Sequence, residues 1–417
     1  MHDEPRQASR SISERQQYDC DTDRDTDRDT DGNIDSIVSI RAIVGRTINM
    51  RLLQLFGVTV GIACWVPVFA QAVPSPVATQ GTTHGRARGA VPPPNLARLV
   101  QAQLTTARVA SRLMGASVHH APRPACSPTQ PKFDWNALKK VSLVQDQGNC
   151  GSCWAFAAVA AYESSYLIEN GLTASDSLPP PPSVDASDQE GLDCSLATDN
   201  CNGGWHDSVL DYFVNSGETT RPKYAAAPPP ESKQYTGAKL QCKSVSPRQY
   251  FAVTWSFVSG QVIPSDSDLK AAICSHGPIV AAVNSQHWDD LLPNNDFVYS
   301  TANPNWSTKF PNGVFTEGAP SKVGLNMDNY NLTPSNLDID HDVLIVGWDD
   351  TIGAWIVKNS WGTSFGEKGY IKLPYGHANI GFNAAWIQAK SIQSTIAPTL
   401  FSTLQDINLI KSPYMAK

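Results

Sequence analysis

The chain has 417 residues, of which 41% are hydrophobic and 17% are charged, and its formal net charge is −7 at pH 7. This composition is typical of a globular protein that is long enough for more than one domain. The acidic balance argues against a nucleic-acid-binding surface, which is normally basic, so we expect no nucleic-acid partner.

An export signal is the first element expected along the chain. Residues 1–49 contain a low-complexity run of Asp, Thr and Arg, which predicts a disordered tail or a start assigned upstream of a true initiator at Met50. Residues 50–72 combine a positive residue, an apolar run and the small-residue pattern Ala70-Gln71-Ala72, which is typical of a signal peptide. An internal core strand or an anchoring helix is the alternative for this run. We expect a secreted protein, extracellular or periplasmic, with no stable membrane span after signal removal.

Residues 73–125 are expected to form a linker or a short pro-segment. Their first part, residues 73–93, is rich in Pro, Gly, Ala and Thr, which predicts a flexible linker. From Asn95 to about Met114, apolar residues recur at helical spacing. This pattern predicts an amphipathic helix, either of a pro-segment or of the mature protein.

Residues 126–390 form the expected main domain, followed by a C-terminal tail over 391–417. The spacing of apolar residues from Ser152 to Ile168 favours a helix. Three apolar runs in the second half predict buried strands: 278–283, 343–348 and 354–358. Helices first and strands later indicate an α+β protein of two lobes. The polar stretch 285–338 is expected to be a surface insertion.

Seven cysteines remain if the tail and the signal are removed. They are Cys126, Cys150, Cys153, Cys194, Cys201, Cys242 and Cys274. In an oxidising compartment an odd count indicates disulfide pairs plus one free thiol. Cys150-x-x-Cys153 alone would also suit a redox pair or half a zinc site, but no second close pair follows, as zinc would require. We therefore expect neither a metal nor another cofactor.

The segment Cys150-Gly151-Ser152-Cys153-Trp154 is the most informative in the chain, and it resembles the papain and cathepsin family. Further segments resemble the family's other motifs in the family's order: 187–194 with 201–205, 340–348, 358–363 and 366–370. Over residues 130–389 the chain is therefore similar to papain-like cysteine peptidases, and we expect a bacterial-type, secreted member. The resemblance implies a helical N-terminal lobe, an antiparallel, β-barrel-like C-terminal lobe and an active site in the cleft between them.

The resemblance also assigns the catalytic residues, and each assignment has a physical reason. Cys153, at the first turn of a helix, lies at the positive end of the helix dipole, which favours a nucleophilic thiolate. His341 would be the base, and Asn359 would orient its ring by accepting from one ring N–H. Gln147, with the backbone N–H of Cys153, would stabilise the oxyanion.

Substrate contacts are expected beside these residues. The resemblance implies that an extended peptide lies against Gly203 and Gly204, next to an aromatic wall formed by Trp205. His206 and Asp342 stand where family members commonly carry apolar residues, so we do not carry over a plain preference for hydrophobic side chains. The remaining expected residues are Ala384 and Ala385, at the far end of this pocket, and Trp361, which would cover the Asn–His hydrogen bond.

Two disulfides follow from the resemblance, Cys150–Cys201 and Cys194–Cys242. Parity then pairs Cys126 with Cys274 and leaves Cys153 as the free thiol. The chain departs from the family in two respects. The separation of Cys153 and His341 exceeds the usual span of about 130–150 residues, and the long helical pro-region of the family is not recognisable.

The expected function is that of a monomeric, secreted cysteine endopeptidase that acts on peptide and protein substrates through an acyl-enzyme thioester. A peptide ligase or acyl transferase would use the same residues, and product analysis with an added amine would distinguish it from a hydrolase. A catalytically silent, peptide-binding relative is the other alternative, against which the complete set of catalytic residues argues. A metal-dependent hydrolase is not expected.

Overall fold

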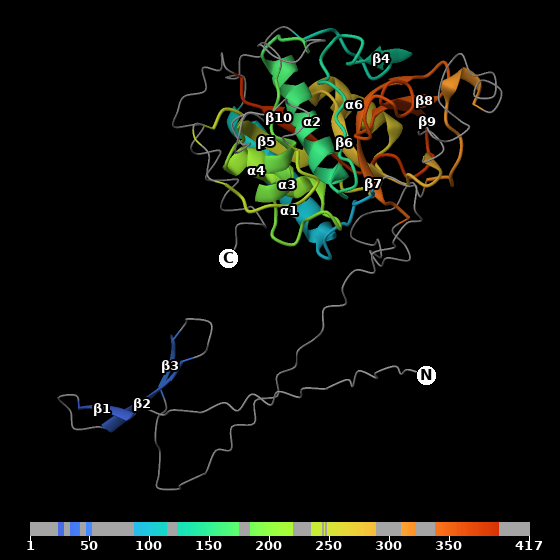
Figure 1. Ribbon diagram of the computed structural model, residues 1–417. Helices are drawn as coiled ribbons and strands as arrows, with labels where there is room; N and C mark the ends of the chain where they lie inside the picture. Colours follow the sequence, from blue (N-terminus) through green and yellow to red (C-terminus); the bar gives the residue numbers. More distant parts are fainter. Residues whose placement is uncertain are drawn as a thin grey trace, which may run out of the picture. The chain divides into compact units, whose positions relative to one another are not determined.

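The computed structural model describes residues 24–28, 34–41, 47–51, 87–114, 123–174, 184–219, 235–243, 246, 248–288, 310–321 and 338–391 (Figure 1). The chain divides into two units, Met1–Pro76 and Val77–Lys417. Most of the expected signal peptide (residues 52–72), most of the stretch 285–338 and the tail beyond Ser391 lie outside the described residues. Among the helices that are described, none is long and apolar enough to cross a membrane.

The first unit contains a small antiparallel sheet. Strands β1 (Arg24–Arg28), β2 (Ile34–Arg41) and β3 (Thr47–Arg51) follow one another in the sheet. Residues 1–49, for which the sequence predicts a disordered tail, therefore contribute β1, β2 and most of β3. Four of the eight residues of β2 are β-branched, which suits a strand, and the low-complexity run of Asp, Thr and Arg does not reveal this local preference.

Three helices form one lobe of the second unit (Figure 1). They are α2 (Cys153–Glu169), α3 (Asp188–Cys194) and α4 (His206–Asn215), and α2 contacts both of the others. Almost every residue of α2 is buried, as expected of a helix that is apolar on all sides. The side chain of Ser187 caps α3 by accepting from the Glu190 backbone N–H.

The second lobe is a seven-stranded antiparallel sheet. Its strand order is β5 (Ala252–Phe257), β10 (Phe382–Ala389), β6 (Ile279–Val283), β7 (His341–Asp349), β8 (Ala354–Lys358) and β9 (Tyr370–Pro374), and β4 (Lys132–Asp134) pairs with β7. Helix α6 (Asp266–His276) packs on β10, β7 and β6, and a short 3-10 helix spans Pro311–Gly313. The three strands predicted from apolar runs are β6, β7 and β8. The prediction of an α+β fold of two lobes is confirmed.

Helix α1 (Leu96–Met114) packs on β5. The buried apolar residues of this helix recur at helical spacing and so lie on one face: Leu96, Leu99, Val100, Ala107 and Ala110. Gln103, on the same face, donates from Nε2 to the backbone carbonyl of Trp255 over 2.6 Å. The amphipathic pattern in the sequence thus corresponds to a helix whose apolar side joins the hydrophobic core.

The disulfides of the second unit join the cysteines paired in the sequence analysis. Cys150–Cys201 and Cys194–Cys242 tie the loops around the helical lobe, and Cys126–Cys274 fastens the segment before β4 to the end of α6. Cys153 is the free cysteine of the described residues, and it is buried. The fold therefore places one reduced thiol at the beginning of α2, a helix that packs against β7 and β10.

Candidate active site

Cys153 is the first residue of α2, so its thiol lies at the positive end of a helix of 17 residues. The residue is fully buried. Backbone N–H groups of Asp342 and Gly89 donate to its sulfur, and both bonds favour the thiolate. Since Asp342 follows His341 on β7, the thiol lies beside the start of that strand.

His341 and Asn359 are held together by the sheet. His341 opens β7 and Asn359 follows the last residue of β8, the strand paired with β7. His341 Nε2 lies 2.7 Å from Asn359 Oδ1, which also accepts from the Ser360 backbone N–H over 2.8 Å. An amide oxygen only accepts, so Nε2 carries the proton and Nδ1 is left as the proton acceptor. Within the described part of the chain, Nδ1 has no hydrogen-bond partner.

Aromatic rings surround this histidine. The ring centroid of Trp361 lies 4.8 Å from that of His341, and the ring of Trp288 lies 5.8 Å away on a perpendicular plane. Both tryptophans and His341 are fully buried. Trp361 thus packs on the His341 ring, and these buried rings keep water from the His341–Asn359 hydrogen bond.

Burial dominates the electrostatics of Cys153 and His341. Burial, and after it the negative charge of Asp342, raises the pKa of the Cys153 thiol far above its ordinary value. Burial also lowers the pKa of His341 to about 3, helped by the positive charge of Arg88 and opposed by the hydrogen bond to Asn359. In this state both groups are therefore neutral, because a dry environment penalises a thiolate and an imidazolium alike.

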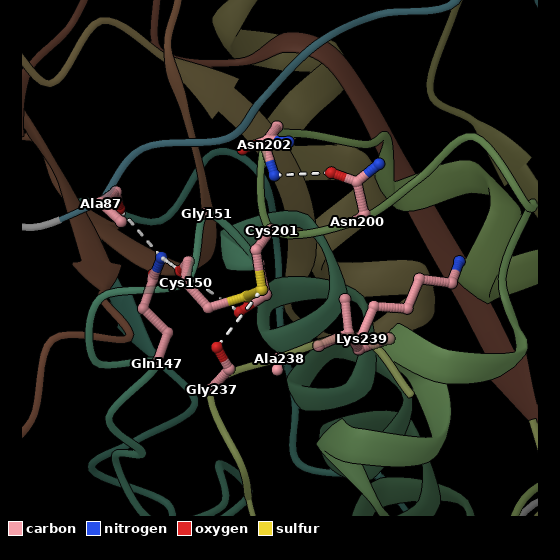
Figure 2. The surroundings of a disulfide bond; sticks show 12 residues. Ala87, Gln147, Cys150, Gly151, Asn200, Cys201, Asn202, Gly237, Ala238 and Lys239 are labelled. Atoms are coloured by element: carbon pink, nitrogen blue, oxygen red, sulfur yellow. Dashed lines mark hydrogen bonds between the residues drawn. A yellow bond between two sulfur atoms is a disulfide. The ribbon is translucent and has the colours of Figure 1, made fainter. Parts of the chain in front are cut away.

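Gln147 presents an amide N–H₂ group next to the Cys150–Cys201 disulfide (Figure 2). Its Nε2 donates to the backbone carbonyls of Cys150, over 2.9 Å, and of Ala87, over 3.0 Å. The Ser360 hydroxyl donates to Oε1 over 2.6 Å and so fixes the orientation of the amide. Both N–H bonds are therefore made to peptide carbonyls, the kind of group that an oxyanion donor stabilises.

A short segment covers the thiol, and we call residues 87–91 the covering segment. It is bonded to both lobes: Gly204 N–H donates to Gly89 C=O, Val91 N–H donates to Gly204 C=O, and Ala90 N–H donates to Asp340 C=O, over 3.0–3.1 Å. Ala90 pairs with Gly204 in parallel orientation. The sequence predicts a flexible linker over residues 73–93, and for residues 87–91 that prediction is wrong, because long-range backbone bonds order them.

Two residues of the covering segment, Gly89 and Arg88, make close contacts with the rest of the protein. A Cβ added to Gly89 would lie 1.9 Å from the carbonyl oxygen of Gly151, so the backbone approaches too closely for any side chain. Arg88 pairs with Asp340 at 3.2 Å, donates to the Ser285 hydroxyl over 2.7 Å, and lies over the Trp361 ring at 5.4 Å. No periodic pattern in the sequence predicts these contacts. The one signal in the sequence for an ordered segment is the Arg88-Gly89 pair, which stands in a stretch otherwise typical of a linker.

The expected substrate residues fall in two groups. Gly203 and Gly204 lie against the covering segment, where a Cβ on Gly203 would meet the Val91 side chain at 2.4 Å. The second group is buried below: Trp205, His206, Asp342, Ala384 and Ala385 are each at most 2% exposed. Of the expected substrate residues, Gly203 and Gly204 therefore contact the covering segment, and the other five are buried.

His206 and Asp342 form an ion pair that the sequence analysis did not foresee. His206 Nδ1 lies 3.0 Å from Asp342 Oδ2, and both side chains are fully buried. The other ring nitrogen lies 3.2 Å from the Asn383 carbonyl oxygen.

In the part of the chain that the structure describes, no group of His, Cys, Asp and Glu residues is arranged to hold a metal ion.

Comparison with known proteins gives a family match over most of the second unit. The sequence model of the papain family cysteine proteases matches residues 129–304 and 325–390. Digestive cysteine proteinase 3 of Homarus americanus is 30% identical over 257 residues, 60% of this chain and 64% of the relative. Cathepsin L of Sarcophaga peregrina is 30% identical over 264 residues, 61% of this chain and 62% of the relative. The chain thus spans slightly less than two thirds of the length of these relatives.

Among solved structures, the protein is similar to the cysteine protease CMS1MS2 of Carica candamarcensis in complex with E-64. The identity is 25%, the comparison covers 62% of this chain and 98% of that one, and the TM-score is 0.43. The two curated relatives named above are from Homarus americanus and Sarcophaga peregrina, which are eukaryotes, and they give no support to the expectation of a bacterial-type member.

Proposed function

The chain belongs to the papain family of cysteine proteases, and we propose that it is a secreted cysteine endopeptidase whose nucleophile is Cys153. The observation that carries this proposal is the convergence of three residues. The free thiol at the start of α2 contacts the backbone of β7 beside His341, and His341 is bonded to Asn359 over 2.7 Å.

These residues suit acyl transfer. His341 Nδ1 takes the thiol proton, and the thiolate attacks the peptide carbonyl carbon to form a thioester, while the protonated ring then donates to the departing amine. Asn359 holds the ring through Nε2. Gln147, oriented by Ser360, stabilises the negative charge that develops on the carbonyl oxygen. A water molecule, activated by the same ring, hydrolyses the thioester.

In the described state the covering segment prevents this reaction. The backbone N–H of Gly89 donates to the Cys153 sulfur, and the Gly89 carbonyl oxygen accepts from the Gly204 N–H. Ala87 occupies the Gln147 donor. We infer that residues 73–125 include a short pro-segment whose part at 87–91 must leave before substrates bind at Gly203 and Gly204. Opening rehydrates Cys153 and His341, which favours their ionised forms.

The floor beneath the glycines belongs to the same proposal. Trp205, His206 and Asp342 are buried, as are Ala384 and Ala385 on β10, and Trp205 and His206 are bonded to Asn383, which precedes Ala384. We propose that they contact the substrate and that the charged pair disfavours a purely apolar side chain there. Three disulfides support an oxidising compartment and hence secretion.

The test is the intact mass of the protein after exposure to an epoxysuccinyl inhibitor, with Cys153→Ala as the matched control. We expect one adduct on the wild type after residues 87–91 have been released by limited proteolysis, and none on the variant. No adduct on the folded, released protein would contradict the proposal and favour a silent relative. An adduct together with amine-ligated products would favour an acyl transferase instead.

A further inference from the structure

The His206–Asp342 pair lies beside the proposed nucleophile, and its protonation can be worked out from its partners. Both ring nitrogens of His206 face oxygen acceptors, the Asp342 carboxylate at 3.0 Å and the Asn383 backbone carbonyl at 3.2 Å. A carbonyl oxygen cannot donate, so Nε2 carries a proton. A carboxylate accepts from Nδ1 when that nitrogen is protonated as well. The arrangement is thus that of an imidazolium between two acceptors.

The surroundings agree with a charged ring. Burial opposes the charge, but the Asp342 carboxylate, its hydrogen bond and the nearby Asp207 together raise the pKa of His206 above its ordinary value. His206 begins α4, where the helix dipole by itself would disfavour a cation, so the acidic neighbours must offset it. The two side chains are completely excluded from solvent, and Asp342 Oδ1 has no hydrogen-bond partner among the described residues.

Asp342 also acts on the thiol. Its backbone N–H donates to the Cys153 sulfur, whereas its carboxylate charge opposes the formation of the thiolate. The charged or titratable groups that face Cys153 and His341 are Asp340 just before β7, Asp342 on β7, Arg88 on the covering segment and Tyr235. Of these, Asp342 carries the charge that opposes the thiolate most.

We propose that His206 is a positioning residue of the proposed reaction: its imidazolium neutralises the Asp342 carboxylate and so keeps that charge from destabilising the Cys153 thiolate. The inference rests on the function proposed above. It gives the buried pair a role in the chemistry that is separate from contact with the substrate. Without His206, a buried unpaired carboxylate would remain next to a group that must itself become negative.

The test is a double-mutant cycle on the full chain, with Arg88→Ala in every protein so that the covering segment has lost its anchor. The four proteins are the parent, His206→Gln, Asp342→Asn and the double variant. The readout is the rate at which iodoacetamide alkylates Cys153, measured by intact mass from acid to alkaline pH. The midpoint of this profile reports the thiol as it titrates with His341.

We expect His206→Gln to raise the midpoint by about one pH unit, which slows alkylation about tenfold below it. The same substitution should leave the midpoint unchanged when Asp342→Asn is present, because no charge then needs compensation. His276→Gln is the control, since His276 stacks on Trp386 at 3.7 Å and does not face the thiol. An equal shift in both backgrounds, or no shift in either, would overturn the inference.

A second measurement does not depend on folding of the variants. In the full chain labelled with ¹⁵N-histidine, NMR should find both His206 ring nitrogens protonated at pH 7, and a neutral ring would overturn the proposal. The two proposals fail in different ways. A Cys153 thiol that reacts no faster than a free cysteine at any pH would contradict the proposed function. A reactive thiol with an unchanged midpoint in His206→Gln would contradict only the role of the pair.

Discussion

Arg88→Ala should open the active site of the full chain. Arg88 donates to the hydroxyl and to the backbone carbonyl of Ser285 over 2.7 and 3.1 Å and pairs with Asp340 at 3.2 Å. The Arg88 and Asp340 side chains are 22% and 30% exposed, so solvent screens part of this interaction, and we assign about 2 kcal/mol to these bonds together. The contact with the Trp361 ring adds about 0.5–1 kcal/mol.

The sum, nearly 3 kcal/mol, corresponds to about a hundredfold increase in the fraction of molecules whose covering segment has left its place. The assay is the second-order rate of inactivation by an epoxysuccinyl inhibitor at low concentration, followed by intact mass. As long as the closed state predominates, this rate is proportional to the open fraction. We therefore expect Arg88→Ala to be inactivated about a hundred times faster than the wild type.

Arg98→Ala provides the control, because Arg98 is an exposed arginine of α1, outside the covering segment. It removes the same charge and should leave the rate unchanged. An equal inactivation rate in wild type and Arg88→Ala, with both proteins folded, would refute the reasoning, since it would mean that Arg88 does not hold the segment in place.

Three further predictions follow from other contacts. Gln147→Ala should lower kcat of the opened, still folded enzyme about a hundredfold, because one donor to the oxyanion is lost; near-normal turnover would remove Gln147 from the mechanism. Burial, and then Asp188 and Glu163, raises the pKa of Glu218 well above its ordinary value, so folding takes up a proton and stability falls as pH rises from the ordinary value through the folded one. Glu218→Gln removes this penalty, and urea unfolding should find it more stable than wild type at pH 7 by about 1 kcal/mol or more, with the gain lost near pH 4; an equal gain at both pH values would contradict the assignment. Replacing Cys126 and Cys274 together by Ala should lower the free energy of unfolding by about 2–4 kcal/mol, because the disulfide closes a long loop with a sequence separation of 148, and an unchanged urea midpoint would argue against it.

Local sequence was sufficient for the elements that carry the proposed catalytic residues. The apolar run after Cys153 predicts α2, and the alternation-free apolar runs after His341 and before Asn359 predict β7 and β8. Each of these patterns spans fewer than 20 residues, so the local sequence is enough to predict the helix or strand. The motif around Gln147 and the number of cysteines are likewise visible in the sequence without any knowledge of the tertiary structure.

The covering segment and the buried ion pair depend instead on contacts between distant parts of the chain. Arg88 and Ser285 are 197 residues apart, and His206 and Asp342 are 136 apart. Residues 87–91 have the composition of a linker, and only their bonds to Gly204 and Asp340 order them.

The sequence by itself thus determined the helical and the strand-rich lobes, the family resemblance and the residues proposed to react. The tertiary structure decided that the thiol is covered, that Cys153 and His341 are neutral while it is covered, and that His206 is paired with Asp342. The physical reason is that secondary structure follows from side-chain spacing along the chain. Hydrogen bonds between distant residues, and the burial that shifts their pKa values, exist only once the chain has folded.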